Sequence, residues 1–349
     1  MSYKEGILEV AKNLPIKNGN FLITGVTGLI GSCIADVLIE ANKNGAHFVI
    51  YGMSRSEDRI KERFENNVIP VVQDVVTLSD SKNQYDYIVH CASNADPRSY
   101  AIQPVETILT NVIGNRNILE YCKKSLSTRM LLTSSFEVYG NIEGVSVYDE
   151  GMSGIIDQTV LRNGYSESKR CCELLVKSYV DEYKVNAVIV RLPSVYGPTM
   201  QKTDSKAHAQ FIKNALKAED IVLKSKGDQR RSYCYVIDAV SGIFKILFEG
   251  INGEIYNVAN ENSIASIAEV AEACAKIAGT KVVYDIPDAV EMKGFSRSKN
   301  CILDNSKLKS LGWEGKYLLC EGIKETILEL KNYDCERKVS CIYEKGVLN

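Results

Sequence analysis

The 349-residue chain carries 42 Lys and Arg residues against 44 Asp and Glu residues, which gives a formal net charge of −2. Its interspersed charges form neither a basic field for nucleic acid nor a polybasic membrane patch, and no apolar run reaches the length of a membrane span or of a signal peptide core. The 11 cysteines include no C-x-x-C pair, so we expect no metal site and no disulfide framework, and a cytoplasmic location.

Short apolar runs alternate with longer amphipathic stretches in the first half of the chain. This alternation predicts a parallel sheet covered by helices on both faces, the doubly wound Rossmann architecture of the α/β class. The predicted strands are residues 21–24, 47–51, 68–72, 85–90, 129–135 and 186–192.

The pattern changes after residue 195. A helix is predicted at 206–218, helical patterns recur at about 264–279 and 321–331, and the polar segment after Tyr333 predicts no element. Strand-like runs lie between these helices, at 221–225, 231–236 and 254–260. We expect a dinucleotide-binding Rossmann domain of residues 1–193 with roughly 233–262. The remaining residues, 194–232 and 263–349, are expected to form a smaller C-terminal α/β lobe that binds the substrate.

A glycine repeat lies between the first predicted strand and the helix that follows it. Glycine permits a tight turn, a close approach of the backbone to a pyrophosphate, and close helix–strand packing. The helix N-terminus adds free N–H groups and a positive dipole end. The predicted cofactor residues of this loop are Gly25, Thr27, Gly28, Leu29, Ile30 and Gly31.

The choice between NAD and NADP stays open on this evidence. An NAD site usually places an acid about 20 residues further on, after the second strand. Here Met53, Ser54 and Arg55 occupy that place. Arg55 could pair with the 2′-phosphate of NADP, cover the adenine, or be a solvated turn residue. Asp74 and Val75, after the third strand, are placed to flank the adenine.

Tyr165 and Lys169 are separated by four residues, so they lie on one face of a predicted helix. Such a pair is common, and it could be a tyrosine at the edge of the core beside a solvated lysine. A free tyrosine has a pKa of about 10, too high for a base at neutral pH. A nearby ammonium and a cationic cofactor ring would lower that pKa. Ser135 ends a predicted strand, where open parallel sheets bind ligands.

Several motifs, in order, resemble the extended short-chain dehydrogenase/reductases, the NAD-dependent nucleotide-sugar epimerases and dehydratases. The matching segments are GVTGLIG (25–31), HCAS (90–93), TNVIGN (110–115), TSSFEVYG (133–140), YSESK (165–169), RLPSVYGP (191–198) and RRSYCYVID (230–238). The resemblance implies that Tyr165 is the catalytic acid/base, that Lys169 is its partner and binds the nicotinamide ribose, and that Ser135 holds the sugar hydroxyl. It also implies a homodimer built through a four-helix bundle that includes the helix of Tyr165. Further cofactor contacts are expected at Cys91, Ala92, Ser93 and Asn111.

The resemblance also implies a shared first step, oxidation of the sugar at C4, after which the outcomes diverge. Return of the hydride to the other face is epimerisation, loss of the C6 hydroxyl is 4,6-dehydration, and loss of a C6 carboxylate is decarboxylation. Phe136 and Glu137 occupy positions that differ between these enzymes. The dTDP-glucose dehydratases have Asp-Glu there, the UDP-galactose epimerases generally lack the glutamate, and the UDP-glucuronate decarboxylases and GDP-mannose dehydratases have Ser-Glu. Glu137 is therefore a predicted catalytic residue.

Other stretches resemble the UDP-glucuronate decarboxylases more specifically. The implied substrate contacts are Tyr100, Arg162, Ser194 and Arg231. Ser194 replaces an asparagine that usually precedes Tyr-Gly-Pro, and Arg231 could instead be a surface arginine opposite Asp228. We expect an enzyme that acts on a nucleotide sugar, preferably a UDP-sugar, and resembles a UDP-glucuronate decarboxylase or a 4,6-dehydratase. The alternatives are a 4-epimerase, a net reductase suggested by Arg55, and a non-catalytic dinucleotide sensor.

Overall fold

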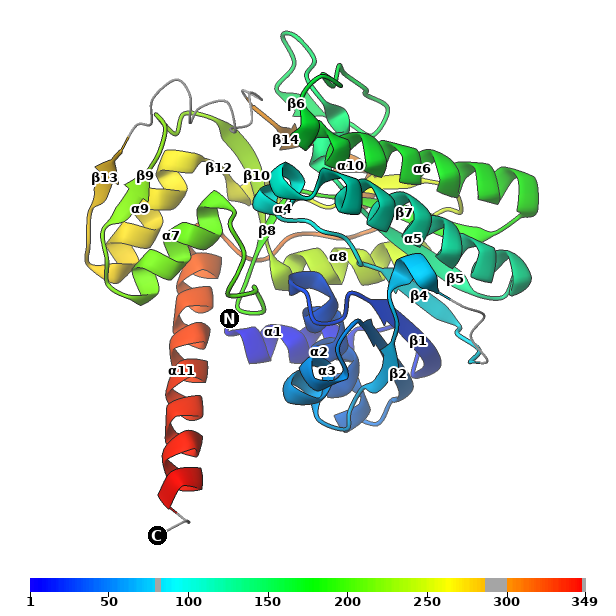
Figure 1. The fold of residues 1–349 in the computed structure, drawn as a ribbon, viewed down its shortest axis with the longest axis horizontal. Helices are drawn as coiled ribbons and strands as arrows, with labels where there is room; N and C mark the ends of the chain where they lie inside the picture. Colours follow the sequence, from blue (N-terminus) through cyan, green and yellow to red (C-terminus); the bar gives the residue numbers. More distant parts are fainter. Residues whose placement is uncertain (79–82, 286–299, 347–349) are drawn as a thin grey trace.

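A seven-stranded parallel sheet forms the centre of the protein, with the strand order β11-β7-β5-β4-β1-β2-β3 (Figure 1). The computed structural model describes residues 1–78, 83–285 and 300–346, with side chains described through residue 332. The strands of the sheet are β1 (Asn18–Thr24), β2 (His47–Ser54), β3 (Ile69–Val72), β4 (Tyr87–His90), β5 (Arg129–Ser135), β7 (Asn186–Leu192) and β11 (Ile255–Asn257). All six strands predicted in the first half of the chain lie in it, which confirms the α/β class and the doubly wound parallel sheet.

Helices cover both faces of this sheet, as Figure 1 shows. One face carries α1 (Tyr3–Lys12), α2 (Leu29–Lys43) and α8 (Val236–Glu249), and the other carries α5 (Pro104–Lys124) and α6 (Gly164–Tyr183). Successive residues of β1 alternate between the two cores, because strand side chains point to opposite faces. Phe21 and Ile23 belong to the core under α2 and α8, while Leu22 belongs to the core under α5 and α6. The short helix α3 (Glu57–Phe64) connects β2 to β3.

Smaller sheets and helices complete the fold beyond the carboxyl end of β7. The three-stranded sheet contains β8 (Ser194–Tyr196), β10 (Arg230–Tyr235) and β12 (Ile264–Ser266), and two strand pairs are formed by β9 (Ile221–Leu223) with β13 (Val282–Tyr284) and by β6 (Val147–Tyr148) with β14 (Ile302–Leu303). The helices are α4 (Pro97–Ile102), α7 (Ala207–Leu216), α9 (Ile267–Ala278), α10 (Ser306–Lys309) and α11 (Leu319–Gly346). Helix α11 continues through the segment after Tyr333, for which the pattern predicted no element.

The helix predicted at about 264–279 begins three residues later than expected. Residues 264–266 form β12, which pairs antiparallel with β10. Helix α9 then starts behind a capping box, in which the Ser266 hydroxyl accepts a hydrogen bond from the Glu269 N–H at 3.1 Å and the Glu269 carboxylate accepts one from the Ser266 N–H at 2.6 Å. The boundary therefore depends on a strand partner about 34 residues away in the chain.

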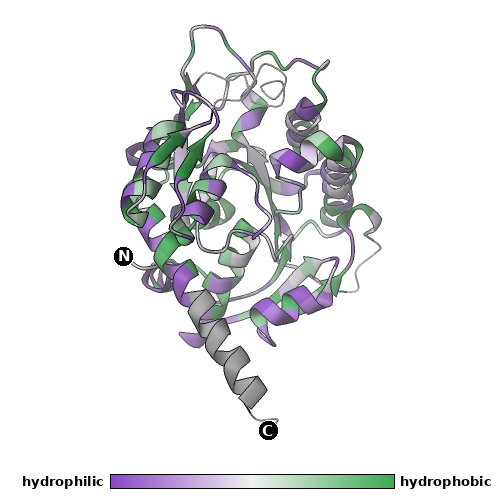
Figure 2. Cartoon of the chain, turned by 60° about the vertical axis from the view of Figure 1, so that its left-hand side comes forward, coloured by the Kyte–Doolittle hydropathy of each residue, from purple (hydrophilic) through white to green (hydrophobic). Residues whose placement is uncertain are grey.

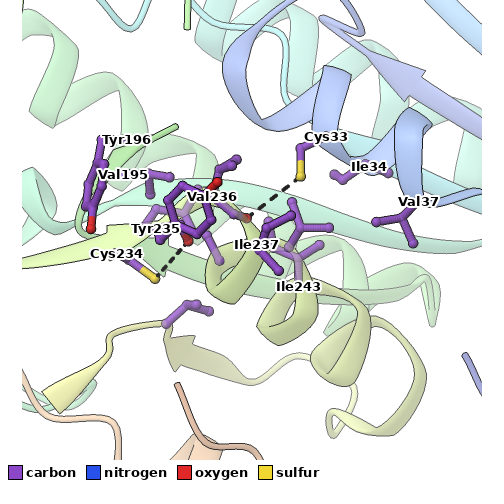
Figure 3. Packing of buried hydrophobic residues seen from close by; sticks show 14 of the residues in the cluster. Cys33, Ile34, Val37, Val195, Tyr196, Cys234, Tyr235, Val236, Ile237 and Ile243 are labelled. Atoms are coloured by element: carbon purple, nitrogen blue, oxygen red, sulfur yellow. Dashed lines mark hydrogen bonds between the residues drawn. The ribbon is translucent and has the colours of Figure 1, made fainter. Parts of the chain in front are cut away.

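The helix that follows the glycine loop is fixed by packing against α8. Figure 3 shows Cys33, Ile34 and Val37 of α2 facing residues at the start of α8, where the Cys33 thiol donates to the carbonyl oxygen of Val236 at 3.9 Å. In Figure 2 the peripheral helices mix hydrophilic and hydrophobic residues along their length, as helices with one buried face do. Among the described residues, no helix is both long and apolar enough to span a membrane.

Two glycines set the distance between β1 and α2. Gly25 has φ +67°, a conformation that side chains other than glycine rarely adopt. A Cβ on Gly31 would lie 2.5 Å from the carbonyl oxygen of Gly25 and 2.8 Å from the Cα of Val26. Both neighbours are backbone atoms, so the contact cannot be relieved by a rotamer change.

Gly31→Ala should therefore destabilise the fold by about 1–3 kcal/mol, the usual cost of overpacking. Gly28→Ala is the matched control in the same loop, since its Cβ would meet a single atom, the Gly25 carbonyl oxygen, at 3.2 Å. Urea unfolding without cofactor measures both changes. Equal free energies of unfolding for the two variants would contradict the packing argument.

Candidate active site

A cavity of about 830 Å³ opens at the carboxyl ends of β1, β4 and β5. The strand order reverses between β1 and β4, and such a reversal is where open parallel sheets bind ligands. The opposite wall comes from α7, β9 and β10. The predicted site residues that line the cavity are Gly25, Gly28, Leu29, Ile30, Gly31, Cys91, Ser93, Tyr100, Ser135, Glu137, Arg162, Tyr165, Lys169, Ser194 and Arg231.

Six predicted cofactor residues lie outside this lining: Thr27, Arg55, Asp74, Val75, Ala92 and Asn111. Asn111 is buried behind the wall, where its amide oxygen accepts a hydrogen bond from the Ser93 hydroxyl at 2.7 Å and its amide nitrogen donates to Ser168 at 2.9 Å. Asn111 is therefore placed to orient Ser93. The Thr27 carbonyl oxygen accepts a hydrogen bond from Gln201 at 3.2 Å.

The predicted adenine residues follow the carboxyl ends of β2 and β3. The Arg55 guanidinium lies 4.0 Å from the Asp74 carboxylate, and the Arg55 side chain is 76% exposed. Asp74 also caps the short helix that begins at Val75, because its carboxylate accepts a hydrogen bond from the Val76 N–H at 2.9 Å. The Val75 side chain is buried toward Gly114 of α5, so any contact of Val75 with a ligand would have to be made by its backbone.

Tyr165 and Lys169 come from the first two turns of α6 and are both buried, at 5% and 4% exposure. The Lys169 ammonium donates to the carbonyl oxygen of Thr133 at 2.9 Å, and burial lowers the pKa of Lys169. Burial raises the pKa of Tyr165, the Glu137 charge raises it further, and hydrogen bonds from the Ser135 and Tyr100 hydroxyls oppose the rise. The predicted lowering of this pKa is therefore not a property of the protein side chains alone, because desolvation and the Glu137 charge outweigh the effect of the two hydroxyls.

Glu137 lies beside the phenol in the short 3-10 helix Phe136–Tyr139, which follows β5. Its carboxylate is 3.6 Å from the Arg162 guanidinium and accepts a hydrogen bond from the Ser166 hydroxyl at 3.0 Å. The Ser135 hydroxyl accepts the Glu137 N–H at 3.3 Å and so caps this helix. Hydrogen bonding and the end of β5 thus bring Ser135, Glu137 and Tyr165 together.

Two further predicted substrate residues have defined positions. The Tyr100 ring stacks on the Tyr165 ring, with centroids 4.3 Å apart and planes inclined by 14°. The Arg231 guanidinium lies 5.9 Å from the centre of the Phe136 ring and donates to the Gln229 side-chain oxygen at 2.8 Å. Arg231 is half-buried in the cavity wall, which disfavours the alternative of a surface arginine opposite Asp228.

A buried ion pair next to the site was missed by the sequence interpretation. Glu173, on α6, binds Arg191 of β7 through two contacts of 3.0 and 2.7 Å, and it accepts a hydrogen bond from the Ser134 hydroxyl at 2.5 Å. Burial lowers the pKa of Arg191, but the bonds and charge of Glu173 outweigh this and raise it. The two charges are 18 positions apart on different elements, so no spacing pattern could have paired them.

The opposite wall holds a second group that the sequence did not single out. His208, at the start of α7, lines the cavity together with Asp204 and Lys206. Burial lowers the pKa of His208 to about 4, and the Lys206 charge acts in the same direction. His208 is therefore neutral at physiological pH. Among the described residues, no group of His, Cys, Asp and Glu side chains is arranged to hold a metal ion.

The glycine loop fits a dinucleotide. Gly28 is the N-cap residue of α2, and it has no side chain with which to cap the free N–H groups of the first turn. Leu29, Ile30 and Gly31 of that turn line the cavity, so their backbone and the positive end of the helix dipole are available to a pyrophosphate. Burial raises the pKa of the nearby Cys91 thiol to about 12, so Cys91 contributes a small neutral side chain.

Comparison with known proteins identifies the family. Residues 21–259 match the model of the NAD dependent epimerase/dehydratase family. The chain belongs to this family. The family description names NAD as the cofactor. The prediction of NAD is therefore confirmed.

The relatives and solved structures agree with this assignment. The chain is 33% identical over 320 residues to UDP-glucuronic acid decarboxylase 6 of Arabidopsis thaliana, covering 88% of this chain and 90% of that protein. It is 29% identical to UDP-N-acetyl-alpha-D-glucosaminuronate decarboxylase of Bacillus cytotoxicus, covering 88% and 96% of the two chains.

Two solved structures share the fold. UDP-glucose 4-epimerase of Thermotoga maritima, in complex with UDP-glucose, has a TM-score of 0.78 at 24% identity and covers 90% of this chain and 99% of its own. The dTDP-glucose 4,6-dehydratase of Bacillus anthracis, in complex with NAD, has a TM-score of 0.75 at 22% identity, with 90% and 96% covered.

Breaking the Glu173–Arg191 pair by removing one partner should destabilise the fold strongly. Glu173→Gln leaves the Arg191 charge buried without its counter-charge, which typically costs about 3–5 kcal/mol. The matched control is Glu249→Gln, which removes the exposed i,i+4 partner of Lys245 on α8 and should cost within about 0.5 kcal/mol. Urea unfolding measures both. A Glu173→Gln loss as small as that of the control would show that the Arg191 charge does not need Glu173 as its counter-charge.

Proposed function

We propose that this protein oxidises a UDP-uronate, such as UDP-glucuronate, transiently at C4 and releases the C6 carboxylate as carbon dioxide. One observation carries the proposal: Ser135, Glu137 and Tyr165 meet in one cavity, whose wall also includes Lys169 and Arg231. The uncapped N-terminus of α2 forms the part of the same cavity that suits a pyrophosphate. Similarity to two decarboxylases of UDP-linked uronates supports the same substrate class.

The proposed role of Tyr165 is that of the base that removes the proton from the 4-hydroxyl group. When bound, NAD accepts the hydride from C4 of the sugar, later returns it, and favours the phenolate through its cationic ring. The Ser135 hydroxyl lowers the pKa of Tyr165, and its proposed role is to hold the same sugar hydroxyl. The Lys169 ammonium, buried and bound to Thr133, would stabilise the phenolate and hold the nicotinamide ribose.

The second step breaks the bond between C5 and C6 of the 4-keto sugar. The electron pair of that bond moves toward the C4 carbonyl as carbon dioxide leaves, and C5 then takes up a proton. Arg231 suits the planar C6 carboxylate, because a guanidinium binds such anions in a bidentate manner. Glu137 is the proposed acid or base for this step, and its pairing with Arg162 holds its carboxylate in the cavity.

Other outcomes remain candidates for the same site. Glu137 favours decarboxylation or 4,6-dehydration over simple 4-epimerisation. Phe136 occupies the position at which the dTDP-glucose 4,6-dehydratases carry an aspartate, which disfavours dehydration. A non-catalytic dinucleotide sensor is disfavoured, because Ser135, Tyr165 and Lys169 all lie in the cavity wall. A net reductase would require NADPH. Since Arg55 lies 4.0 Å from Asp74, a 2′-phosphate would have to approach that carboxylate as well.

The arrangement of the chain supports three further proposals. Residues 1–193 with roughly 233–262 are proposed to bind the dinucleotide, since they supply the seven-stranded sheet, and residues 194–232 and 263–349 to bind the nucleotide sugar. The described cysteines are free thiols, which favours a reducing cytoplasm.

A homodimer is proposed through α5 and α6, which lie side by side (Figure 1) and expose a row of large apolar residues.

The function is tested by mass spectrometry of the products formed from UDP-glucuronate, UDP-N-acetylglucosaminuronate, UDP-glucose, dTDP-glucose and GDP-mannose with NAD. We expect a product that is lighter by carbon dioxide from a UDP-uronate. A product of unchanged mass with a new retention time would instead identify a 4-epimerase. A product lighter by water would identify a dehydratase.

Tyr165→Phe is the control in the same assay, since it keeps the ring and removes the base. Loss of general base catalysis typically lowers the rate by about 10²–10⁴. Near-normal turnover by this variant would mean that the activity comes from a contaminant or from another mechanism. NAD binding, monitored through the fluorescence of the protein, checks that the variant is folded.

The dimer proposal rests on the exposed residues Val105, Ile108 and Leu109 of α5 and Leu174 of α6, which are 64%, 37%, 39% and 66% exposed. Leu109→Asp combined with Leu174→Asp should convert a dimer to a monomer, because a desolvated charge opposes association. Light scattering coupled to size exclusion measures the mass. Leu126→Asp is the control, since Leu126 is 54% exposed beyond the end of α5. A wild-type monomer, or a variant that stays dimeric, would contradict this interface.

A further inference from the structure

We propose that Tyr100 is a positioning residue for Tyr165, acting through its stacked ring and its hydroxyl rather than only as a contact for the substrate. This inference rests on the proposed function, in which Tyr165 is the base. The two phenol rings are nearly parallel, with centroids 4.3 Å apart. Both are buried, Tyr100 at 3% and Tyr165 at 5% exposure. Parallel stacking at this distance leaves the Tyr165 ring little freedom to tilt.

The two hydroxyls also interact. The Tyr100 hydroxyl favours the phenolate form of Tyr165 and so lowers the pKa of Tyr165, while Tyr165 raises the pKa of Tyr100. The Ser135 hydroxyl also lowers the pKa of Tyr165, so two neutral hydroxyl groups favour the phenolate of the residue that must lose its proton.

Tyr100 is itself held by a fixed helix. It lies on α4, whose N-terminus is capped by the Asp96 carboxylate through the N–H groups of Arg98 at 3.0 Å and Ser99 at 3.4 Å. The same carboxylate accepts the Ser205 N–H at 2.7 Å and the Ser205 hydroxyl at 2.9 Å. Ser205 belongs to the segment that precedes α7, on the opposite side of the cavity. Asp96 thus fixes α4 to that wall, and the Tyr100 ring has a defined position before any ligand binds.

The charges around the two phenols explain why a neutral donor matters here. Glu137, from the helix after β5, disfavours the phenolate of Tyr165, and Cys172 of α6 acts in the same direction. Arg162 lies 3.6 Å from Glu137 and opposes the effect of Glu137 at Tyr100. Lys169, one turn further along α6, donates to Thr133. The Glu137 carboxylate raises the pKa of Tyr165, and neutral hydroxyl groups that favour the phenolate offset part of this rise.

The test is the pH dependence of kcat and KM for wild type and Tyr100→Phe, measured with UDP-glucuronate as substrate. Turnover needs the phenolate, so kcat rises as the pH rises through the pKa of Tyr165 in the loaded enzyme. Removing one donor raises that pKa, so the acid limb of the kcat profile should move up by about 1 pH unit. At a pH on that limb, kcat should fall about tenfold, and it should recover at higher pH while KM changes little.

Tyr100→Leu separates the ring from the hydroxyl. It removes the stack as well, so kcat should stay low at every pH. Tyr121→Phe, a remote tyrosine whose hydroxyl donates to the Asn83 carbonyl, is the control and should leave the profile unchanged. NAD binding by each variant confirms folding.

The outcomes distinguish this inference from the proposed function. If Tyr100→Phe raises KM and leaves the acid limb in place, Tyr100 only contacts the substrate and the inference is overturned. An unchanged profile in all respects overturns it as well. If the wild type releases no carbon dioxide from UDP-glucuronate, the proposed substrate fails first, and the same pH comparison on whichever nucleotide sugar is converted decides the role of Tyr100.

Discussion

The buried ammonium of Lys169 is the constraint around which the candidate site is arranged. An unpaired charge in a protein interior is very costly, so the carboxyl ends of the strands must supply a partner without adding a second charge. The partner is the Thr133 carbonyl, and the Thr133 hydroxyl donates to the His90 carbonyl at 2.9 Å. The Thr24 hydroxyl oxygen accepts the N–H groups of Cys91 and Ala92. Its proton is therefore available to His90 Nδ1, 2.8 Å away.

This arrangement assigns the state of His90. If the Thr24 hydroxyl donates to Nδ1, the imidazole is neutral and carries its proton on Nε2. Burial lowers the pKa of His90 to about 3, and the Lys169 charge acts in the same direction. A neutral histidine can link β1 to β4 without repelling the ammonium. The carboxyl ends of β1, β4 and β5 thus accommodate the Lys169 ammonium with neutral groups only.

The buried face of α6 places three functional groups at four-residue intervals. Tyr165, Lys169 and Glu173 are all buried, and residues four apart lie on one helical face. The phenol faces the cavity, the ammonium reaches Thr133 on β5, and the carboxylate binds Ser134 of β5 and Arg191 of β7. One helix face therefore fixes the ends of two strands and presents the phenol. The rotation of α6 is set by these polar contacts as well as by apolar packing.

Much of this could be predicted from the sequence, because local periodicity determines it. The six strands of the first half were found from short apolar runs, and the Tyr165–Lys169 face followed from a spacing of four. Contacts between distant segments were not predictable in this way. The Glu173–Arg191 pair joins two elements, and the Tyr100–Tyr165 stack joins residues from α4 and α6. The rise that burial causes in the Tyr165 pKa was not predictable either, since it depends on how deeply the phenol lies in the folded chain.

Glu137 couples the strength of the base to the choice of product. Its carboxylate is the group proposed for the step after C4 oxidation, yet it also disfavours the phenolate of Tyr165. The Arg162 guanidinium at 3.6 Å compensates for part of this charge. Replacing Glu137 alone would leave Arg162 uncompensated near the phenol and would favour the phenolate. A chain that changed its product through this position would therefore change the pH at which its base operates, unless residue 162 changed as well.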